Sequence, residues 1–485
     1  MQCDISKVPD ETKKERLKEL NWLLYQCTNK AEEALNIFNK KTNETQVLQL
    51  VINRIHQISN EIQYSNLGQN EFLSAKHEIR SILAQIAGTW SSTNWQCPST
   101  TNSYIKEKGI SQVEENTYTR AYGSEYVKAY EKQFIQEYYK IPSELSSRTL
   151  GYITNSGLKA LETALLVYKQ ITGDKFPVFY QEGSYYEGIS IQRIFLNDAR
   201  EVHVSGIYDL LDSKEEIGGI IIDSATTWPA SEGIDLDLFF EKVRTHEQKS
   251  PMVIIYDRTL SSVSIQLFEN FAKDLPLTIV LISIESAIKY YQYGLDLINL
   301  GCIVMYSSLF RIKKYFDLID YTFRILTASP DPTLIMKMPA PSIQLIEERM
   351  IRFSKNMELY VSFFKFLKKE GLVSEVLTSI NLDKRLKILG MNWTGSLIYV
   401  TVGHLYTHKQ YEDFAAYVVK NAPPELHLHM GAGFGFDTTR LSTVYNVLMD
   451  SDGRCALRFS VGTESRNEVF HKCNYLYNCF KDLSN

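Results

Sequence analysis

Cysteine is scarce in this chain and follows no ligand pattern. The 7 cysteines among 485 residues are odd in number, scattered and without a CxxC pair. This argues against a disulfide framework or a zinc ribbon and fits a reducing compartment. His427-Leu428-His429 has a spacing that puts both rings on one strand face, yet no third ligand is near in sequence. We therefore expect no metal site.

Long apolar runs and a strong charge of one sign are also missing. No run reaches the ~18 apolar residues of a membrane span, and the first 20 residues lack the apolar core of a signal peptide. The formal net charge of −5 is small for this length and argues against a nucleic-acid binder that works through overall charge. We expect a cytoplasmic protein with no membrane and no nucleic-acid partner.

What the chain does contain is apolar residues with clear periodicity. Hydrophobic residues make up 44% of the sequence, enough for large cores in two or three domains. Helical spacing from residue 8 to about 90 predicts three or four helices, with breaks near Asn29-Lys30, Thr42-Asn43 and Ser65-Asn66. A Ser/Thr/Asn-rich stretch over 89–103 predicts a linker.

From about residue 125 to 308, short β-branched runs alternate with amphipathic helices, which predicts a mostly parallel sheet covered by helices on both faces. The expected strands are 150–154, 177–180, 201–204, 219–223, 252–256, 277–282 and 302–306. The expected helices between them include 157–168, 236–245 and 265–273. Helices at 308–326 and 341–369 then lead to a smaller α+β region with strands 396–402 and 457–461 and a last helix at 466–481.

Three of the expected strands end beside complementary chemical groups. Strand 277–282 is followed by Lys289, strand 252–256 by Asp257, and strand 150–154 by Ser156-Gly157 and a helix. Open α/β sheets bind ligands at the carboxyl ends of their strands. Pyridoxal 5'-phosphate requires an amine for its Schiff base, a carboxylate on its ring nitrogen and a helix N-terminus for its phosphate. The sequence therefore predicts a site for this cofactor, with Lys289 as the amine.

Six short motifs add to this prediction because of their order. They are Tyr118-Thr119-Arg120, Ser156-Gly157-Leu158, Tyr186-Glu187-Gly188, Tyr256-Asp257-Arg258-Thr259, Ser286-Ala287-Ile288-Lys289-Tyr290 and, near the C-terminus, Leu457-Arg458-Phe459-Ser460-Val461-Gly462-Thr463-Glu464. Read in order, they resemble the motifs of the cystathionine γ-synthase / methionine γ-lyase group of pyridoxal-phosphate enzymes, the Cys/Met metabolism family. Each motif alone occurs by chance in many proteins, so the resemblance depends on order and spacing. It covers roughly residues 115 to 475.

The resemblance implies the α/β fold type I of pyridoxal-phosphate-dependent transferases, with a smaller C-terminal α+β domain. Lys289 would carry the Schiff base, Asp257 would bind the ring nitrogen and Tyr186 would stack on the ring. Arg458 would clamp the substrate carboxylate. The phosphate would be held by Ser156, Gly157, Leu158 and Ser286.

The resemblance also implies an assembly. In the family, the residues matching Tyr118 and Arg120 reach across a dimer interface to the neighbouring subunit's phosphate. We therefore expect a homodimer or homotetramer with shared active sites. The expected division is a helical extension over 1–90, a linker and dimer-crossing segment over 91–124, a cofactor-binding large domain over 125–330 and a small domain over 331–485.

The implied activity is that of a lyase or transferase of amino-acid metabolism, working through a Cα carbanion. The resemblance indicates γ-elimination or γ-replacement on a homoserine-, cysteine- or methionine-like substrate. Ile288 stands where the family has a Thr on the phosphate, and Thr226 or Thr227 would have to replace the family's Asn on the ring hydroxyl. The bulky Trp228 and Phe434 suggest a substrate unlike the usual ones.

Three alternatives have to be weighed at this level, and the third is discounted. A fold-type I aminotransferase shares the sheet, the Asp and the Lys. A degenerate fold kept as a binding or scaffold module would explain the departures at Ile288 and Thr227. The spacing of Ser286 and Lys289 also matches the S-x-x-K of penicillin-interacting serine enzymes, but no S-D-N or K-T-G companion occurs.

Overall fold

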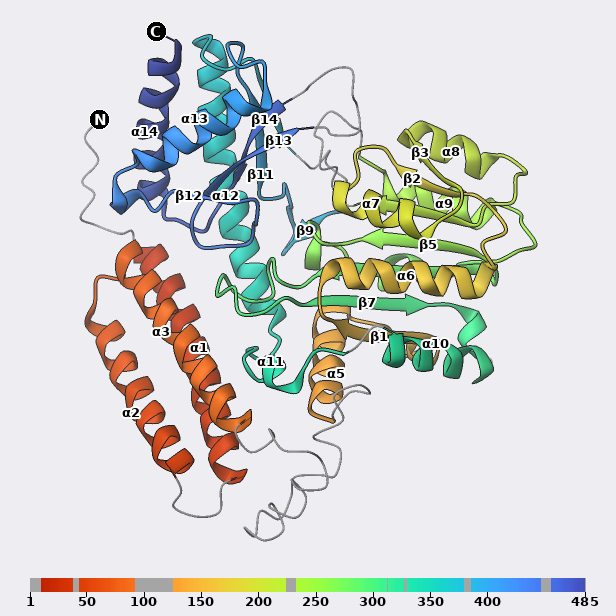
Figure 1. Ribbon diagram of the computed structural model, residues 1–485, viewed down its shortest axis with the longest axis horizontal. Coiled ribbons are helices and arrows are strands. Elements are labelled where there is room, and N and C mark those ends of the chain that lie inside the picture. Colours follow the sequence, from red (N-terminus) through yellow and green to blue (C-terminus); the bar gives the residue numbers. More distant parts are fainter. Residues whose placement is uncertain are drawn as a thin grey trace.

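The structure is a computed structural model that describes residues 10–37, 43–91, 125–223, 233–311, 313–326, 329–378, 385–445 and 455–484. Figure 1 shows three groups of elements: N-terminal helices in red and orange, a large sheet with helices in yellow to green, and a smaller sheet with helices in blue. Tyr118, Arg120, Thr226, Thr227 and Trp228 lie outside the described residues. Within the described ranges, no helix is long and apolar enough to cross a bilayer.

In the described part of the N-terminal region, three helices pack against one another: α1 (Asp10–Ile37), α2 (Asn43–Tyr64) and α3 (Gln69–Ser91). The breaks predicted before Asn43 and after Tyr64 are confirmed. The break predicted at Asn29-Lys30 is wrong, because α1 continues through it. Lys30 and Ala31 lie on the buried stripe of that helix, and packing overrides the weak helix propensity of Asn.

Seven strands within the described ranges form the large sheet, in the order β1-β7-β6-β5-β4-β2-β3. They are β1 (Thr149–Thr154), β2 (Val178–Gln181), β3 (Ala199–Val202), β4 (Gly219–Asp223), β5 (Met252–Asp257), β6 (Ile279–Ser286) and β7 (Gly301–Tyr306). The neighbouring strands from β3 to β6 pair in parallel, and β7 runs antiparallel to both β6 and β1. The predicted mostly parallel sheet is confirmed.

Helices cover the sheet because the central strands are apolar on both faces. They are α5 (Glu125–Tyr139), α6 (Gly157–Thr172), α7 (Tyr186–Phe195), α8 (Val204–Asp212), α9 (Leu236–Thr245) and α10 (Lys313–Leu326). Figure 1 shows α6 lying across the front of the strands, and its apolar side chains join a core with β5 and β6. The helix predicted at 265–273 is only a π-helical turn, Phe268–Ala272, and Pro276 disfavours a longer helix. The sequence did not predict α7 and α8.

The C-terminal region has its own sheet, in the order β12-β13-β14-β11-β8. Its strands are β8 (Glu375–Thr378), β11 (Leu397–Thr401), β12 (His429–Met430), β13 (Arg440–Tyr445) and β14 (Cys455–Ser460), and a separate hairpin joins β9 (Lys387–Ile388) to β10 (Met391–Asn392). The helices of this part are α11 (Pro332–Met336), α12 (Ile343–Lys369), α13 (His408–Lys420) and α14 (Arg466–Ser484). The predicted strands at 396–402 and 457–461 are confirmed as β11 and β14. The domain boundaries stay a prediction.

The predicted histidine strand is wrong. His427 has a φ of +44° at the end of a short 3-10 turn, and only His429 belongs to β12. The His427 ring instead contacts the Asn70 side chain, 2.5 Å from Nε2 to Oδ1. Among the described residues, no group of three His, Cys, Asp or Glu side chains is placed to hold a metal ion.

Candidate active site

The carboxyl ends of the central strands meet at one edge of the large sheet, and a cavity of about 360 Å³ opens there. In the strand register, Asp223 at the end of β4 pairs with Asp257 at the end of β5, and Asp257 pairs with Ile284 of β6. Small-molecule sites typically have volumes of about 300–1,000 Å³. The cavity is therefore large enough for a small ligand at the position expected from the strand ends.

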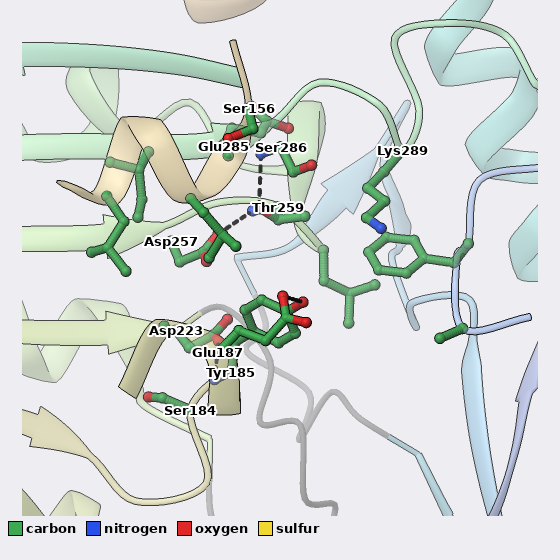
Figure 2. A pocket seen from close by; sticks show the side chains of 18 of the residues that line it. Ser156, Ser184, Tyr185, Glu187, Asp223, Asp257, Thr259, Glu285, Ser286 and Lys289 are labelled. Carbon is green, nitrogen blue, oxygen red and sulfur yellow. Dashed lines mark hydrogen bonds between the residues drawn. The ribbon is translucent and has the colours of Figure 1, made fainter. Parts of the chain in front are cut away.

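Most of the predicted site residues line this one cavity. They are Ser156, Gly157, Leu158, Asp257, Ser286, Lys289 and Arg458. Figure 2 shows Asp257 and Lys289 on opposite sides of a common space, with Ser156 and Ser286 together at its upper edge. Tyr186 is the first residue of α7, and its side chain is not among the described ones. The neighbouring Tyr185 and Glu187 line the cavity.

The N-terminus of α6 forms one wall of the cavity. Ser156 caps the helix by accepting a hydrogen bond from the backbone N–H of Lys159, 3.1 Å away. Gly157 packs directly against Ser286, because a Cβ at position 157 would lie 2.7 Å from the Ser286 Cβ. The exposed N–H groups and the helix dipole at this end favour an anion. Glycine is needed here so that the two segments can approach so closely.

Thr259 links the carboxylate to the end of the next strand. Its backbone N–H donates to Asp257 Oδ1 at 2.9 Å, and its Oγ1 accepts from the N–H of Ser286 at 3.0 Å. Figure 2 shows both bonds as dashed lines. Burial raises the pKa of Asp257, while the bonds from Thr259 and the charge of Lys289 oppose that shift. The sequence motifs gave Thr259 no role, although the D-x-T spacing is that of an Asx turn.

A buried ion pair, whose Glu285 also lines the cavity, fixes the ends of β5 and β6. Arg258 Nε lies 3.0 Å from Glu285 Oε2, and both side chains are fully buried. The Arg258 guanidinium also stacks 3.8 Å from the centre of the Tyr139 ring, and its backbone N–H donates to Ile284 O at 2.9 Å. These contacts fix Arg258 and Glu285, the residues next to Asp257 and Ser286. The side chains of Asp257 and Ser286 therefore keep a fixed separation.

Lys289 follows β6 by three residues, because this strand extends to Ser286 rather than ending at Ile282. Its Nζ lies 5.0 Å from the centre of the Phe434 ring. Burial lowers the pKa of Lys289, and the positive charge of Arg458 lowers it further. A lowered pKa makes the neutral, nucleophilic form of the amine more abundant near neutral pH.

Arg458 lines the cavity from the C-terminal sheet. It is a buried residue of β14, and its Nε donates to Ser442 Oγ on β13 at 3.2 Å. Its guanidinium also donates to the backbone carbonyl of Ala432. The cavity therefore lies between the large sheet, which carries Asp257 and Lys289, and the C-terminal sheet.

Besides Asp257 and the paired Glu285, two further carboxylates line the cavity, and neither was predicted as a site residue. Asp223 Oδ2 accepts from the backbone N–H of Tyr185 at 3.3 Å, and Glu187 accepts from the hydroxyl of Tyr185. The strand-end rule that pointed to Asp257 would also have found Asp223, since Asp223 ends β4. Glu187 stands where the matched family motif has a glycine.

Comparison with known proteins finds similar structures but no matching family profile or curated sequence. Similar solved structures include cystathionine gamma synthase from Xanthomonas oryzae pv. oryzae, at 14% identity and a TM-score of 0.53, with 75% of this chain and 88% of that chain covered. Cystathionine gamma-lyase from Lactobacillus plantarum is 15% identical, with a TM-score of 0.53 and coverage of 76% and 91%.

A third similar structure is the serine palmitoyltransferase of Sphingomonas wittichii, at 12% identity and a TM-score of 0.51, with 74% of this chain and 77% of that chain covered. The chain has the type I fold of pyridoxal-phosphate enzymes. The predicted fold class is thus confirmed, and the first two structures carry names from the group that the sequence motifs resemble. At 12 to 15% identity this likeness concerns the fold, so the reaction has to be argued from the side chains.

Proposed function

We propose that this protein binds pyridoxal 5'-phosphate and acts on the Cα of an amino acid, as a lyase or transferase of the γ-elimination or γ-replacement class. The observation that carries the proposal is the meeting of three groups at one cavity. Lys289, Asp257 and the Ser156-capped N-terminus of α6 come from distant parts of the sequence and line the same space.

The residues present fit this cofactor. Gly157 and Ser286 are in tight contact and both line the cavity, so a helix N-terminus and a hydroxyl-bearing side chain lie together there, as a phosphate needs. Asp257 suits the ring nitrogen, because a carboxylate there keeps the ring protonated. The Lys289 amine would form the covalent link, and its lowered pKa favours that reaction.

Each residue would then have a defined task. When bound, the cofactor withdraws electrons from the substrate Cα and makes its proton acidic. Lys289, once released by the substrate, would move that proton as a general base. Arg458 would hold the substrate carboxylate through a charge-assisted pair. A second deprotonation at Cβ would follow and allow a γ-substituent to leave.

The proposed assembly rests on the sequence motifs. Tyr118 and Arg120 would complete the phosphate site of a neighbouring subunit, which makes the functional unit a homodimer or a homotetramer. Tyr186 would stack on the ring, a role consistent with its place next to two residues that line the cavity.

The first experiment is a visible absorption spectrum of the protein with added cofactor, compared with Lys289→Ala. The wild type should turn yellow, and borohydride reduction followed by peptide mapping should place a pyridoxyl group on Lys289. Lys289→Ala should lose the band. Lys355→Ala, at an exposed lysine of α12, is the matched control and should keep it.

Screening of amino acids with γ-leaving groups then tests the reaction class. Release of a keto acid and the γ-substituent supports elimination, whereas turnover that requires a keto-acid acceptor indicates an aminotransferase. A wild-type protein that stays colourless with added cofactor would overturn the proposal and favour the scaffold alternative.

A further inference from the structure

A buried cluster of charged side chains joins the N-terminal helices to the rest of the molecule. Its members lie on α1, α3, α12 and the turn before β13, and all are nearly inaccessible to solvent: Glu19, Lys76, Arg349, Arg352 and Asp437. Lys76 Nζ lies 3.0 Å from Asp437 Oδ2, and Arg349 bridges Asp437 Oδ1 at 2.7 Å and Glu19 Oε1 at 2.5 Å. Glu19 also pairs with Lys76 and Arg352.

The cluster holds one specific stretch of backbone, residues 431–437, hereafter the 431–437 segment. Besides the ion pairs to the side chain of Asp437, Gln69 Nε2 donates to the Asp437 carbonyl at 3.3 Å. Arg349 donates to the carbonyl of Gly435, also at 3.3 Å. Both Gln69 and Lys76 belong to α3, so an N-terminal helix fixes the end of this segment.

The 431–437 segment in turn touches the two residues on which the proposed chemistry depends. Gly435 has a φ of +87°, and a Cβ there would overlap the carbonyl oxygen of Lys289. The Phe434 ring lies under the Lys289 amine, and the Ala432 carbonyl accepts from Arg458. The segment therefore sets the environment of both side chains.

Lys76 also binds the stretch of chain that follows Lys289. Lys76 donates to the backbone carbonyl of Tyr293. The next residue, Gly294, has a φ of +78°, and a Cβ there would lie 2.9 Å from Arg349 Nη2. Lys76 thus contacts the backbone of the segment that follows Lys289 and the Asp437 side chain of the segment that packs against Lys289.

We propose that Lys76 and Gln69, on α3, are positioning residues for Lys289 and Arg458, so that the N-terminal helices are a working part of the active-site wall. Their role is to hold the 431–437 segment against Lys289. The inference rests on the proposed function only in naming Lys289 as the reacting amine and Arg458 as the substrate anchor.

A buried lysine with a purely structural role would stabilise the fold without affecting Lys289, and the chain offers a control for that case. Lys30, on α1, is also a buried lysine, and its amine donates to the Tyr126 hydroxyl at 3.1 Å. It has no contact with the 431–437 segment in the bonds and ion pairs of the described residues. Lys76→Met and Lys30→Met therefore each remove a lysine charge from the N-terminal helices. Within the described residues, Lys76 is connected to the site, whereas Lys30 is not.

The experiment compares full-length variants without added cofactor, by amide hydrogen exchange and by the pH profile of Lys289 methylation with formaldehyde and borohydride. In Lys76→Met, peptides covering 431–437 and 290–294 should exchange roughly tenfold faster, as expected when a charge-assisted bond to a loop is lost. The Lys289 profile should move to higher pH, because the amine loses its buried surroundings. Lys30→Met should show neither change, and Lys76→Arg should restore part of both.

Equal profiles for Lys76→Met and Lys30→Met would overturn the proposal. If Lys76→Met does not fold, Gln69→Ala decides: it removes the bond to the Asp437 carbonyl and one bond from Arg16, which keeps its ion pair with Glu468. Faster exchange of the 431–437 segment together with a shifted Lys289 profile would support the proposal, and an unchanged profile would overturn it. Neither measurement needs the cofactor, so its failure to bind would affect the proposed function alone.

Discussion

At the scale of single residues, the surroundings of two cavity-lining groups shift their pKa values in opposite directions. Burial raises the pKa of Asp257, and burial together with Arg458 lowers the pKa of Lys289. Groups with perturbed pKa values that share a cavity are typical of functional sites. The lowering of the Lys289 pKa depends in part on the C-terminal sheet, because Arg458 lies on β14 of that sheet whereas Lys289 follows β6.

Arg458→Gln should therefore have two separable effects. Loss of the cation should raise the pKa of Lys289, so the pH profile of its reaction with pyridoxal phosphate should move to higher pH. Loss of the proposed carboxylate anchor should weaken the binding of amino-acid substrates roughly tenfold or more. Arg440→Gln should shift the profile less, because Arg440 is a smaller influence on Lys289. An unchanged profile in Arg458→Gln would contradict this assignment.

At the scale of secondary-structure elements, the decisive contact is between the N-terminus of α6 and the end of β6. Helix α6 begins at Gly157, and a side chain at this position would press on Ser286. This contact places a helix N-terminus at the edge of the cavity. The proposed anion site would thus be built from one glycine and the strand beside it.

Gly157→Ala should push these two elements apart. We expect a loss of about 1–3 kcal/mol in the free energy of unfolding, as in other overpacked sites, and about tenfold weaker binding of pyridoxal phosphate. Gly88→Ala on α3 is the matched control, because a Cβ there meets nothing within 4 Å. That variant should gain up to about 1 kcal/mol from helix propensity and keep cofactor affinity. Fluorescence titration with the cofactor and chemical unfolding give both values.

At the scale of the whole molecule, the charged cluster around Glu19 ties three parts of the fold together. Its neighbours Lys76, Arg349 and Arg352 hold the pKa of Glu19 below its usual value of 4.5, against the effect of burial. A carboxyl with a depressed native pKa contributes stability above its unfolded pKa and loses it as the pH falls through the native value. The contribution is therefore complete at pH 7 and declines below about pH 4.5.

Glu19→Gln should destabilise the protein by roughly 3–5 kcal/mol at pH 7, because three buried cations lose a shared anion. The difference from wild type in the midpoint of thermal unfolding should narrow as the pH is lowered below 4.5, the usual pKa of Glu19. Glu78→Gln removes a half-exposed partner of Arg54 and should cost less than about 1 kcal/mol. Thermal unfolding scans at one heating rate check both variants. A difference in midpoint between Glu19→Gln and wild type that is independent of pH would contradict the role of Glu19.

Much of the fold and part of the site follow from local patterns in the sequence. Apolar runs in the sequence correctly predicted the central strands, since a strand buried on both faces has few other arrangements. The strand-end rule placed Asp257, Lys289 and Gly157 at one edge of the sheet from their spacing along the chain. One error arose where packing outweighs local preference, in the unbroken α1, and another where the effect of Pro276 was missed, at the single turn Phe268–Ala272.

The sequence by itself thus determined the alternation of strands and helices, the edge at which a ligand would bind and the residues most suited to pyridoxal phosphate. The tertiary structure decided what surrounds them. It alone showed that Arg458 lowers the pKa of Lys289, set Thr259 between Asp257 and Ser286, and connected α3 to the 431–437 segment. The physical reason is that periodicity reports burial along one element, whereas contacts such as Lys76 with Asp437 join residues 361 positions apart and leave no local pattern.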